Sequence, residues 1–161
     1  MSYKLHQLDF SIPSIQVFES IKNEDWSVFL NSNNKQYPDQ RFDILSAKPK
    51  KKIIFSDDNT YLINGDQQPK KSELCPFELL KKIMSEYESN SNPEIPFSGG
   101  AIGYISYDYG NYLHNIENKN KSFNHPLFAF GIYDWAIIYD YAQEKSFLLY
   151  YEKNAITENI I

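Results

Sequence analysis

The sequence predicts an α+β fold with mostly antiparallel, sandwich-like sheets and two or three short helices. Short segments of alternating apolar and polar residues follow one another directly, which is typical of antiparallel strands. Two segments have helical spacing, and each lies between groups of strands. Aromatic residues form 16% of the 161 residues, with 13 Tyr and 11 Phe, and such side chains are favoured in sheets.

The first part of the chain is expected to contain five strands and one helix. Residues 1–10 form the first strand, and Pro13 favours the start of a helix that ends near Asn23. The helix face expected to be buried carries Val17, Phe18 and Ile21. Turn-forming residues at 32–39 predict a loop. Further strands are expected at 26–32, 41–47, 53–55 and 61–63, the last two forming a hairpin around 57–59.

The second part is expected to contain one helix and four strands. Residues 65–72 are polar and predict a loop, and a helix from Pro76 to Tyr87 follows. Its buried stripe is expected to consist of Phe77, Leu80, Met84 and Tyr87. Residues 111–125 predict a polar surface excursion. The last strands are expected at 127–133, 134–141 and 145–152, with a turn near Gln143.

The remaining strand lies in a glycine-rich segment, Pro96 to Gly110, which holds four of the six glycines. Both alternating faces are mostly apolar or aromatic, which predicts a central strand buried on two sides. The strand is expected to begin after a turn at Ser98-Gly99-Gly100. A phosphate loop is not expected, because its glycines would lie between a strand and a helix, whereas these precede a strand.

Composition excludes several classes of function. The net charge of −5 argues against nucleic acid as a partner, since a basic face is the usual footprint. No apolar run is long enough for a secretory signal or a membrane span. The single cysteine, Cys75, indicates a reducing, cytoplasmic location and is expected to be a partly buried small residue. The basic run Lys48 to Lys52 is expected to protect a solvated sheet edge.

Individual residues indicate no catalytic set. His6, His114 and His125 are scattered and lack metal-binding spacing. Asp108, Asp134 and Asp140 stand at the ends of strands, where aspartate is common for structural reasons. Arg41 lies on a strand next to Asp43 and is either half of a buried ion pair or a clamp for a carboxylate.

Three segments together resemble the N-terminal domain of para-aminobenzoate synthase component I, in the anthranilate synthase component I family. The first combines Ser32 with Pro38 and the run RFDI at 41–44, followed by AKP at 47–49. The second is PFSGGAIG at 96–103 with Tyr107-Asp108, and the third is GIYDWAII at 131–138. Asn31 and Phe42-Asp43 depart from the residues usual in anthranilate synthase itself.

The resemblance implies a role in folate synthesis, in which the whole enzyme adds ammonia to chorismate. It identifies residues 1–161 as the N-terminal domain, without the C-terminal chorismate-binding domain that carries the catalytic lysine and the Mg²⁺ carboxylates. The implied partners are this C-terminal domain and a glutamine amidotransferase subunit. We expect no cofactor in this part, Mg²⁺ for the full-length enzyme, and no activity from this chain alone.

The family's N-terminal domain carries a pocket for L-tryptophan. By motif match, Ser32 would hydrogen-bond the ligand, Arg41 and Phe42 would line the pocket, and Asp39 and Gln40 would adjoin it. The fragment is expected to bind tryptophan weakly or not at all, because half a pocket loses most of its enclosure. Two alternatives stay open: a stand-alone module that binds an aromatic amino acid, and the equivalent domain of anthranilate synthase.

Overall fold

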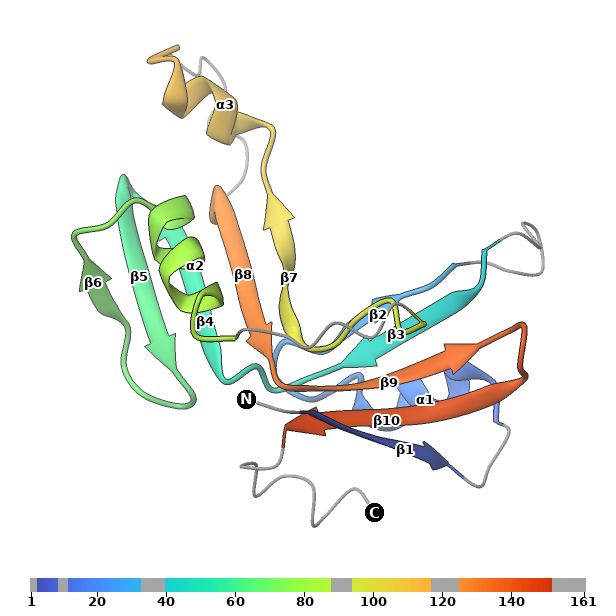
Figure 1. Cartoon of the computed structure of the whole chain (residues 1–161). Coiled ribbons are helices and arrows are strands. Elements are labelled where there is room, and N and C mark those ends of the chain that lie inside the picture. Colours follow the sequence, from blue (N-terminus) through green and yellow to red (C-terminus); the bar gives the residue numbers. More distant parts are fainter. Residues whose placement is uncertain (1–2, 9–11, 33–39, 88–93, 117–124, 152–161) are drawn as a thin grey trace. The chain divides into compact units, whose positions relative to one another are not determined.

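The computed structural model describes residues 3–8, 12–32, 40–87, 94–116 and 125–151, which contain ten strands and three helices. Figure 1 shows these elements along the chain. In order they are β1 (Tyr3–Leu8), α1 (Ser14–Ile21), β2 (Val28–Leu30), β3 (Phe42–Ser46), β4 (Lys51–Ser56), β5 (Asn59–Asn64), β6 (Lys70–Ser72), α2 (Pro76–Met84), β7 (Gly100–Ile105), α3 (Asp108–Leu113), β8 (Phe128–Tyr133), β9 (Trp135–Asp140) and β10 (Lys145–Tyr151).

The chain divides into two compact units, each built on one five-stranded sheet. The first unit comprises Met1–Pro49, Tyr87–Gly100 and Tyr133–Ile161, and its strand order is β1-β10-β9-β3-β2. The second comprises Lys50–Glu86 and Ala101–Ile132, with the order β6-β5-β4-β8-β7. Pairing within both sheets is antiparallel, as in β10–β9 and β4–β5. The predicted α+β class, with antiparallel sheets and short helices, is therefore confirmed.

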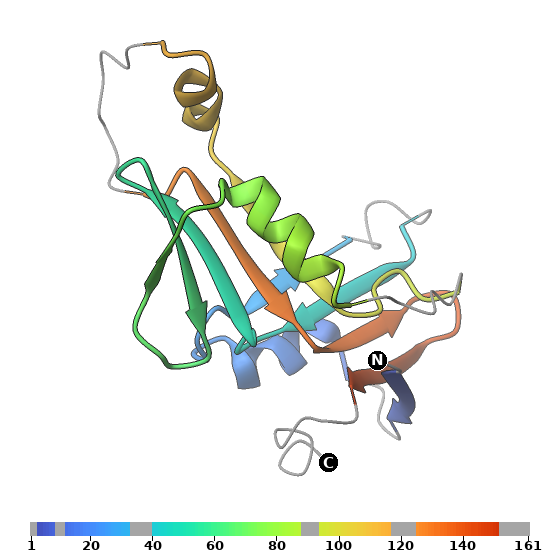
Figure 2. The same cartoon turned by 60° about the vertical axis from the view of Figure 1, so that its left-hand side comes forward.

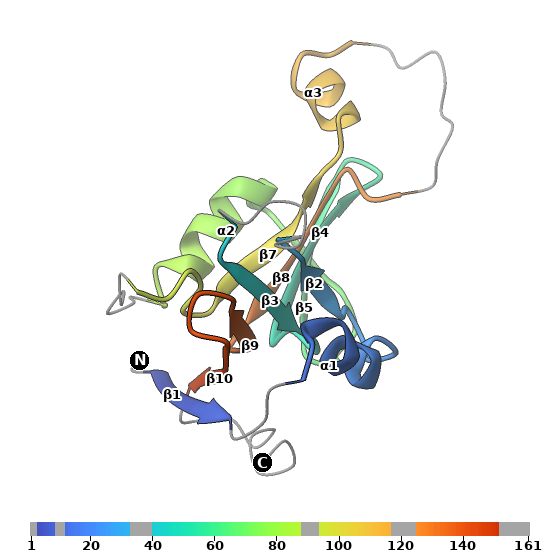
Figure 3. The same cartoon turned by 90° about the vertical axis from the view of Figure 1, so that its right-hand side faces the viewer.

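In the first unit, both faces of the sheet bury apolar side chains. One face packs against α1, whose Val17 is buried while Phe18 and Ile21 are partly buried, as the spacing predicts. Figure 3 shows this helix beside β2 and β3. The core on this side contains Leu45, Ala47, Trp135, Ile137 and Leu148. The opposite face carries Ala136, Ile138 and Leu149, which pack against the partly buried side chains of Tyr3, Phe42, Ile44, Ile95 and Phe97.

In the second unit, α2 lies along one face of the sheet (Figure 2). Pro76 occupies the first turn as predicted, but the helix ends at Met84, before Tyr87. The predicted buried stripe is wrong in part: the helix buries Pro76, Leu79 and Ile83 while Phe77 stays 45% exposed. Of the predicted residues, Tyr87 is buried, and Leu80 and Met84 are half-buried. The helix is apolar over so much of its circumference that spacing alone allows two adjoining stripes, and packing against the sheet selects one.

The glycine-rich segment corrects a second prediction. The turn before the strand is confirmed, with φ of 88° at Gly99 and 138° at Gly100. β7, however, is the last strand of its sheet rather than a central one, and Tyr104 and Ile105 are each 46% exposed. Residues 108–113, expected as the end of a strand and the start of a surface excursion, form α3 instead.

Three smaller expectations also fail. The polar segment 65–72 contains the short edge strand β6, because backbone pairing with β5 does not require apolar side chains. Lys51 and Lys52 lie on β4 in the interior of the sheet, so the basic run does not protect an edge. Lys51 instead forms an ion pair with Glu86 at 2.9 Å. Cys75 is exposed and precedes α2, where its carbonyl accepts the hydrogen bond of Leu79.

Candidate functional site

Two aspartates lie on paired strands at the same end of the first sheet, on opposite faces. Asp43 belongs to β3 and Asp140 to β9, and the strand register pairs Phe42 with Asp140 and Asp43 with Tyr139. Since successive side chains of a strand point to opposite faces, Asp140 shares a face with Phe42, whereas Asp43 faces the side covered by α1. The two carboxylates therefore have different surroundings.

Asp43 is fully buried and accepts five hydrogen bonds from neutral donors. Hydrogen bonds to an ionised carboxylate are the stronger kind, and five of them offset much of the cost of burying its charge. The donors are the Ser14 hydroxyl, Asn31 Nδ2 at 3.1 Å, the Ser32 amide at 2.7 Å, the Ser32 hydroxyl at 2.9 Å and the Tyr141 hydroxyl at 2.9 Å.

These bonds determine the position of Ser32, the predicted ligand contact. Both its amide and its hydroxyl donate to the same oxygen of Asp43, Oδ1. The Ser32 hydroxyl therefore uses its one proton within the protein, and toward a ligand it can only accept a hydrogen bond. A ligand group that suits this arrangement is an ammonium, which is a donor only.

Tyr141 closes the cluster from the turn between β9 and β10. Burial is the largest cause that raises the pKa of Tyr141, and its hydrogen bond to the Asp43 carboxylate raises it further, while Ser14 acts in the opposite direction. The phenol therefore stays protonated and continues to donate to Asp43 at neutral pH.

Asp140 forms an ion pair with the guanidinium of Arg41. The Arg41 Nε donates to Oδ1 at 2.9 Å and a terminal nitrogen donates to Oδ2 at 2.7 Å, a bidentate pair. The Asp140 side chain is 2% exposed and that of Arg41 is 42% exposed. The Arg41 hydrogen bond holds the pKa of Asp140 below its ordinary value, and the amide of Ala142 lowers it further. The guanidinium also lies over the Phe42 ring, 4.6 Å from its centre.

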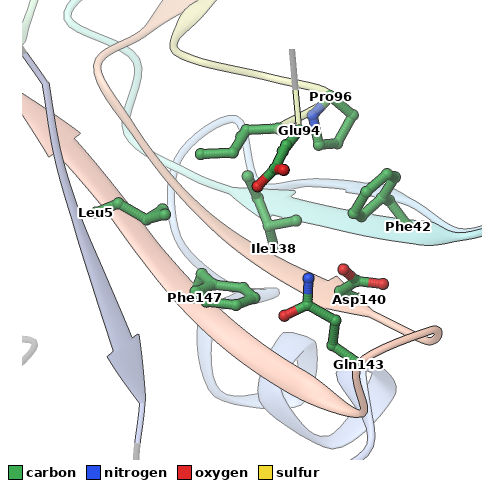
Figure 4. A pocket seen from close by; sticks show the side chains of 9 residues that line it. Leu5, Phe42, Glu94, Pro96, Ile138, Asp140, Gln143 and Phe147 are labelled. Atoms are coloured by element: carbon green, nitrogen blue, oxygen red, sulfur yellow. The ribbon is translucent and has the colours of Figure 1, made fainter. Parts of the chain in front are cut away.

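A cavity of about 150 Å³ opens beside Asp140 on the face opposite α1. Figure 4 shows the carboxylate of Glu94 directed toward the middle of this cavity, above Ile138. The walls combine apolar side chains with a few polar groups, as is usual for sites that bind small molecules. The lining residues are Leu5, Phe42, Glu94, Ile95, Pro96, Ile138, Asp140, Gln143 and Phe147.

The five residues predicted from the sequence have separate locations. Phe42 lines the cavity, and Arg41 lies beside it through its pair with Asp140. Ser32 is bound to Asp43 and is not among the lining residues. Gln40 is exposed just before β3, and Asp39 falls outside the described residues.

Sequence reasoning missed most of the cavity lining. The sequence places Asp140 at a strand end, Gln143 in a turn and Phe147 in a strand, but it indicates no binding role for these residues or for Glu94. One signal was present: Asp140 continues the alternation of Ala136 and Ile138, which places a carboxylate on an apolar face. The lining residues outside β9 come from four separate segments, and only the fold brings them together.

Among the described residues, no three His, Cys, Asp or Glu side chains lie close enough together to bind a metal ion. Within the same residues, no helix is both long and apolar enough to cross a bilayer.

Comparison with known proteins identifies relatives of this chain. A model of the chorismate binding enzyme family matches residues 27–159. Aminodeoxychorismate synthase component 1 from Klebsiella aerogenes is 28% identical over 138 residues, which cover 84% of this chain and 30% of the relative. Anthranilate synthase component 1 from Lactococcus lactis subsp. lactis is 30% identical over 150 residues, 89% of this chain and 30% of that protein.

The solved structures show the same fold. The crystal structure of anthranilate synthase component I from Streptococcus pneumoniae TIGR4 matches with a TM-score of 0.57 at 23% identity, over 96% of this chain and 32% of that one. This chain thus spans about 30% of the length of the curated relatives that it matches. The resemblance predicted from the sequence motifs is confirmed, and the chain belongs to the chorismate binding enzyme family.

Proposed function

We propose that this chain supplies the N-terminal, non-catalytic part of an aminodeoxychorismate synthase component 1, which adds ammonia to chorismate to give 4-amino-4-deoxychorismate. The observation that carries the proposal is the match to the Klebsiella aerogenes protein of that name over 84% of this chain. The three sequence motifs, centred on RFDI, PFSGGAIG and GIYDWAII, support the same assignment.

The described residues of this chain do not offer groups that suit the chemistry itself. Asp43 is saturated by its five donors, and Asp140 is paired with Arg41. The donor sets in the described residues do not fit Mg²⁺, which prefers several oxygen ligands around one point. We therefore assign the chorismate site, the catalytic lysine and the Mg²⁺ carboxylates to the part of the relatives that this chain does not span.

The proposed enzyme requires two partners. The first is the C-terminal domain, which corresponds to the uncovered part of the relatives and is called the companion polypeptide whether it continues this chain or is encoded separately. The second is a glutamine amidotransferase subunit that supplies ammonia. A cytoplasmic location accords with the single cysteine of the chain, since disulfides are rare in reducing compartments.

The cavity beside Asp140 supports a role as one half of a tryptophan-type pocket. Phe42 and Phe147 offer apolar walls for an indole, and the Glu94 carboxylate could accept the ligand ammonium. The volume of about 150 Å³ is below the roughly 300 Å³ at which typical ligand sites begin. We therefore propose that segments outside this chain complete the pocket, and that this chain alone binds L-tryptophan weakly or not at all.

Turnover tests the assignment of the chemistry. Chorismate, ammonia and Mg²⁺ are incubated with this chain alone, with the companion polypeptide alone, and with both, and the products are separated by chromatography. We expect 4-amino-4-deoxychorismate only when the companion is present. Product from this chain alone would show that the chemistry resides in the 161 residues. Anthranilate as the product would instead favour the equivalent role in anthranilate synthase, which the Lactococcus lactis relative represents.

A second candidate, favoured by the cavity, is a stand-alone module that binds an aromatic amino acid. Isothermal titration of this chain with L-tryptophan separates the two. Micromolar binding that is lost in Phe42→Ala, and retained in the control Phe77→Ala of the other unit, would support a complete pocket within this chain. Failure to bind at millimolar ligand accords with a half pocket.

A further inference from the structure

Exposed apolar side chains concentrate in one short segment of the second unit. Eleven large hydrophobic residues are exposed in the described part of the chain, and six of them lie between residues 104 and 116. Tyr107 is 92% exposed, Ile116 58% and Leu113 56%. Single exposed apolar residues are ordinary, but six within thirteen positions are an unusual concentration, referred to below as the patch. The six are Tyr104, Ile105, Tyr107, Tyr112, Leu113 and Ile116.

The same segment contains a sheet edge without the usual protection. β7 is the terminal strand of its sheet among the described residues. Natural edge strands are commonly blocked by lysine, proline or inward charges, because open backbone groups invite another strand. Residues 100–116 contain neither lysine nor proline, and their one acidic or basic residue besides His114 is Asp108, which follows the strand.

The sequence of β7 is also that of a strand covered on both sides. Its two alternating faces are mostly apolar or aromatic, the pattern of strands in the interior of a protein. In this chain, Tyr104 and Ile105 remain 46% exposed. The residues of β7 therefore suit a burial that the described part of the chain does not supply.

The exposed helix is held firmly from its inner side. Tyr109 is 3% exposed, and its ring lies 5.5 Å from Phe55, 5.8 Å from Phe77 and 6.1 Å from Phe128, measured between ring centres. The amide of Ser106 donates to the carbonyl of Leu127 at 2.8 Å. Leu113 thus lies on an anchored helix, and Tyr107 and Ile116 lie just before and just after it.

A groove next to this helix could accommodate a side chain of the partner. It measures about 500 Å³ and is lined by aromatic rings, among them Phe55, Phe77 and Tyr112, and by polar groups of the β4–β5 turn and of residues 71–75. Leu113 lines it as well. The exposed patch and the groove therefore adjoin each other in the same unit.

We propose that the β7 edge and α3, together with the residues on either side of α3, form the docking surface for the companion polypeptide, which adds a strand to β7 and packs apolar side chains on Tyr107, Leu113 and Ile116. This inference rests on the proposed function. The companion is the chosen occupant because this chain spans only 30% of its relatives, so most of their polypeptide has no counterpart here. An edge strand recognises a partner strand through main-chain hydrogen bonds, which are independent of side-chain identity.

Hydrogen exchange tests the proposal. The companion is identified in the source genome by alignment with the uncovered part of the Klebsiella aerogenes relative, whether it continues the same reading frame or has its own gene. Exchange of peptides covering residues 100–116 is compared between this chain alone and its complex with the companion, or the continuous polypeptide. We expect the amides of β7 to exchange about tenfold more slowly, or slower still, when the companion is present.

Substitutions on the patch provide the second arm. Leu113→Lys and Ile116→Lys alter exposed positions, so the isolated chain should keep its thermal midpoint. Each is expected to weaken binding of the companion by about tenfold or more, since a charge would be buried against an apolar surface. The matched control is Ile15→Lys, a 51% exposed isoleucine on α1 of the other unit, which should leave binding unchanged.

Four outcomes would overturn the docking surface. In the binding experiments, the companion could bind without slowing exchange in β7, or the patch variants could bind it as well as Ile15→Lys does. The other two are a genome that encodes no companion and a dimer of this chain that protects the same amides. Turnover measured on the same samples separates the two proposals. Turnover without protection of β7 refutes the docking surface alone, and protection without turnover refutes the proposed function alone.

Discussion

Asp43 and Asp140 lie on adjacent strands at the same end of one sheet, yet their carboxylates have different kinds of hydrogen-bond partner. Asp43 is surrounded by neutral donors from α1, from the segment after β2 and from the turn after β9. Asp140 is held by the amide of Ala142 and by one guanidinium, that of Arg41, which is itself 42% exposed. Their side chains are almost equally buried, at 0% and 2% exposure, so burial alone does not distinguish them.

The difference indicates which carboxylate is structural and which can respond to a ligand. Asp43 ties together four segments that are distant in sequence, and its oxygens are occupied by protein donors. Asp140 lines a cavity, and its partner Arg41 reaches solvent. A ligand at the cavity could therefore rearrange the second pair at little cost, whereas displacing Asp43 would leave several buried donors without a partner.

The substitution Asp43→Ala tests this difference most directly and should have the largest effect on stability. The substitution removes the acceptor of five hydrogen bonds and leaves buried hydroxyl and amide donors unsatisfied, so we expect a loss of about 3–5 kcal/mol in the free energy of unfolding. Urea denaturation followed by circular dichroism measures it. The matched control is Asp58→Ala in the β4–β5 turn, which should cost much less. Similar losses in both variants would contradict a structural role specific to Asp43.

Arg41→Gln tests the other carboxylate and should cost less. Asp140 keeps the amide of Ala142 as a donor at 2.9 Å, and solvent can reach the site that Arg41 vacates. We expect a measurable loss in the free energy of unfolding that is clearly smaller than the loss in Asp43→Ala. Lys22→Gln, which removes the exposed ion pair with Glu19, is the control and should be close to neutral. If Arg41→Gln lowered the free energy of unfolding as much as Asp43→Ala, the two carboxylates would be equally important for stability, which contradicts the proposed difference between them.

The pH dependence of stability tests whether the pair of Arg41 and Asp140 stabilises the fold. Because Arg41 lowers the folded-state pKa of Asp140, the stabilisation by this pair is fully present above the ordinary aspartate pKa, about 3.9, and is lost as the pH falls through the lower folded-state value. In Asp140→Asn this part of the acid-induced loss should vanish. Urea midpoints measured between pH 6 and about pH 3 check it. An unchanged pH slope in the variant would show that the pair does not contribute.

Much of the fold could be predicted because it follows from local patterns. The spacing of Val17, Phe18 and Ile21 identified the buried face of α1, and the alternation at 53–55 and 61–63 identified the β4–β5 hairpin. The failures arose where partners far along the chain decide. The position of β7 at the sheet edge depends on what lies beside it, and local alternation carries no information about neighbours.

The candidate site was less accessible from the sequence for the same reason. Family motifs pointed to Ser32, Arg41 and Phe42, which do lie near the two aspartates. They could not show that the Ser32 hydroxyl donates to Asp43, or that Glu94 reaches the cavity beside Asp140. Both facts depend on contacts between segments separated by many residues, which neither spacing nor composition encodes.

The smallest expected effect concerns a single donor of the Asp43 cluster. Tyr141→Phe removes one of five hydrogen bonds and keeps the ring, which meets Tyr139 edge to face with ring centres 4.8 Å apart. We expect a loss of about 1 kcal/mol, because the four remaining donors still satisfy the carboxylate. Tyr139→Phe is the matched control, since it preserves the same ring contact and leaves the bond to Asp43 in place. If both variants lose equally, the hydroxyl of Tyr141 contributes no more than that of Tyr139, and its bond to Asp43 adds nothing specific to the cluster.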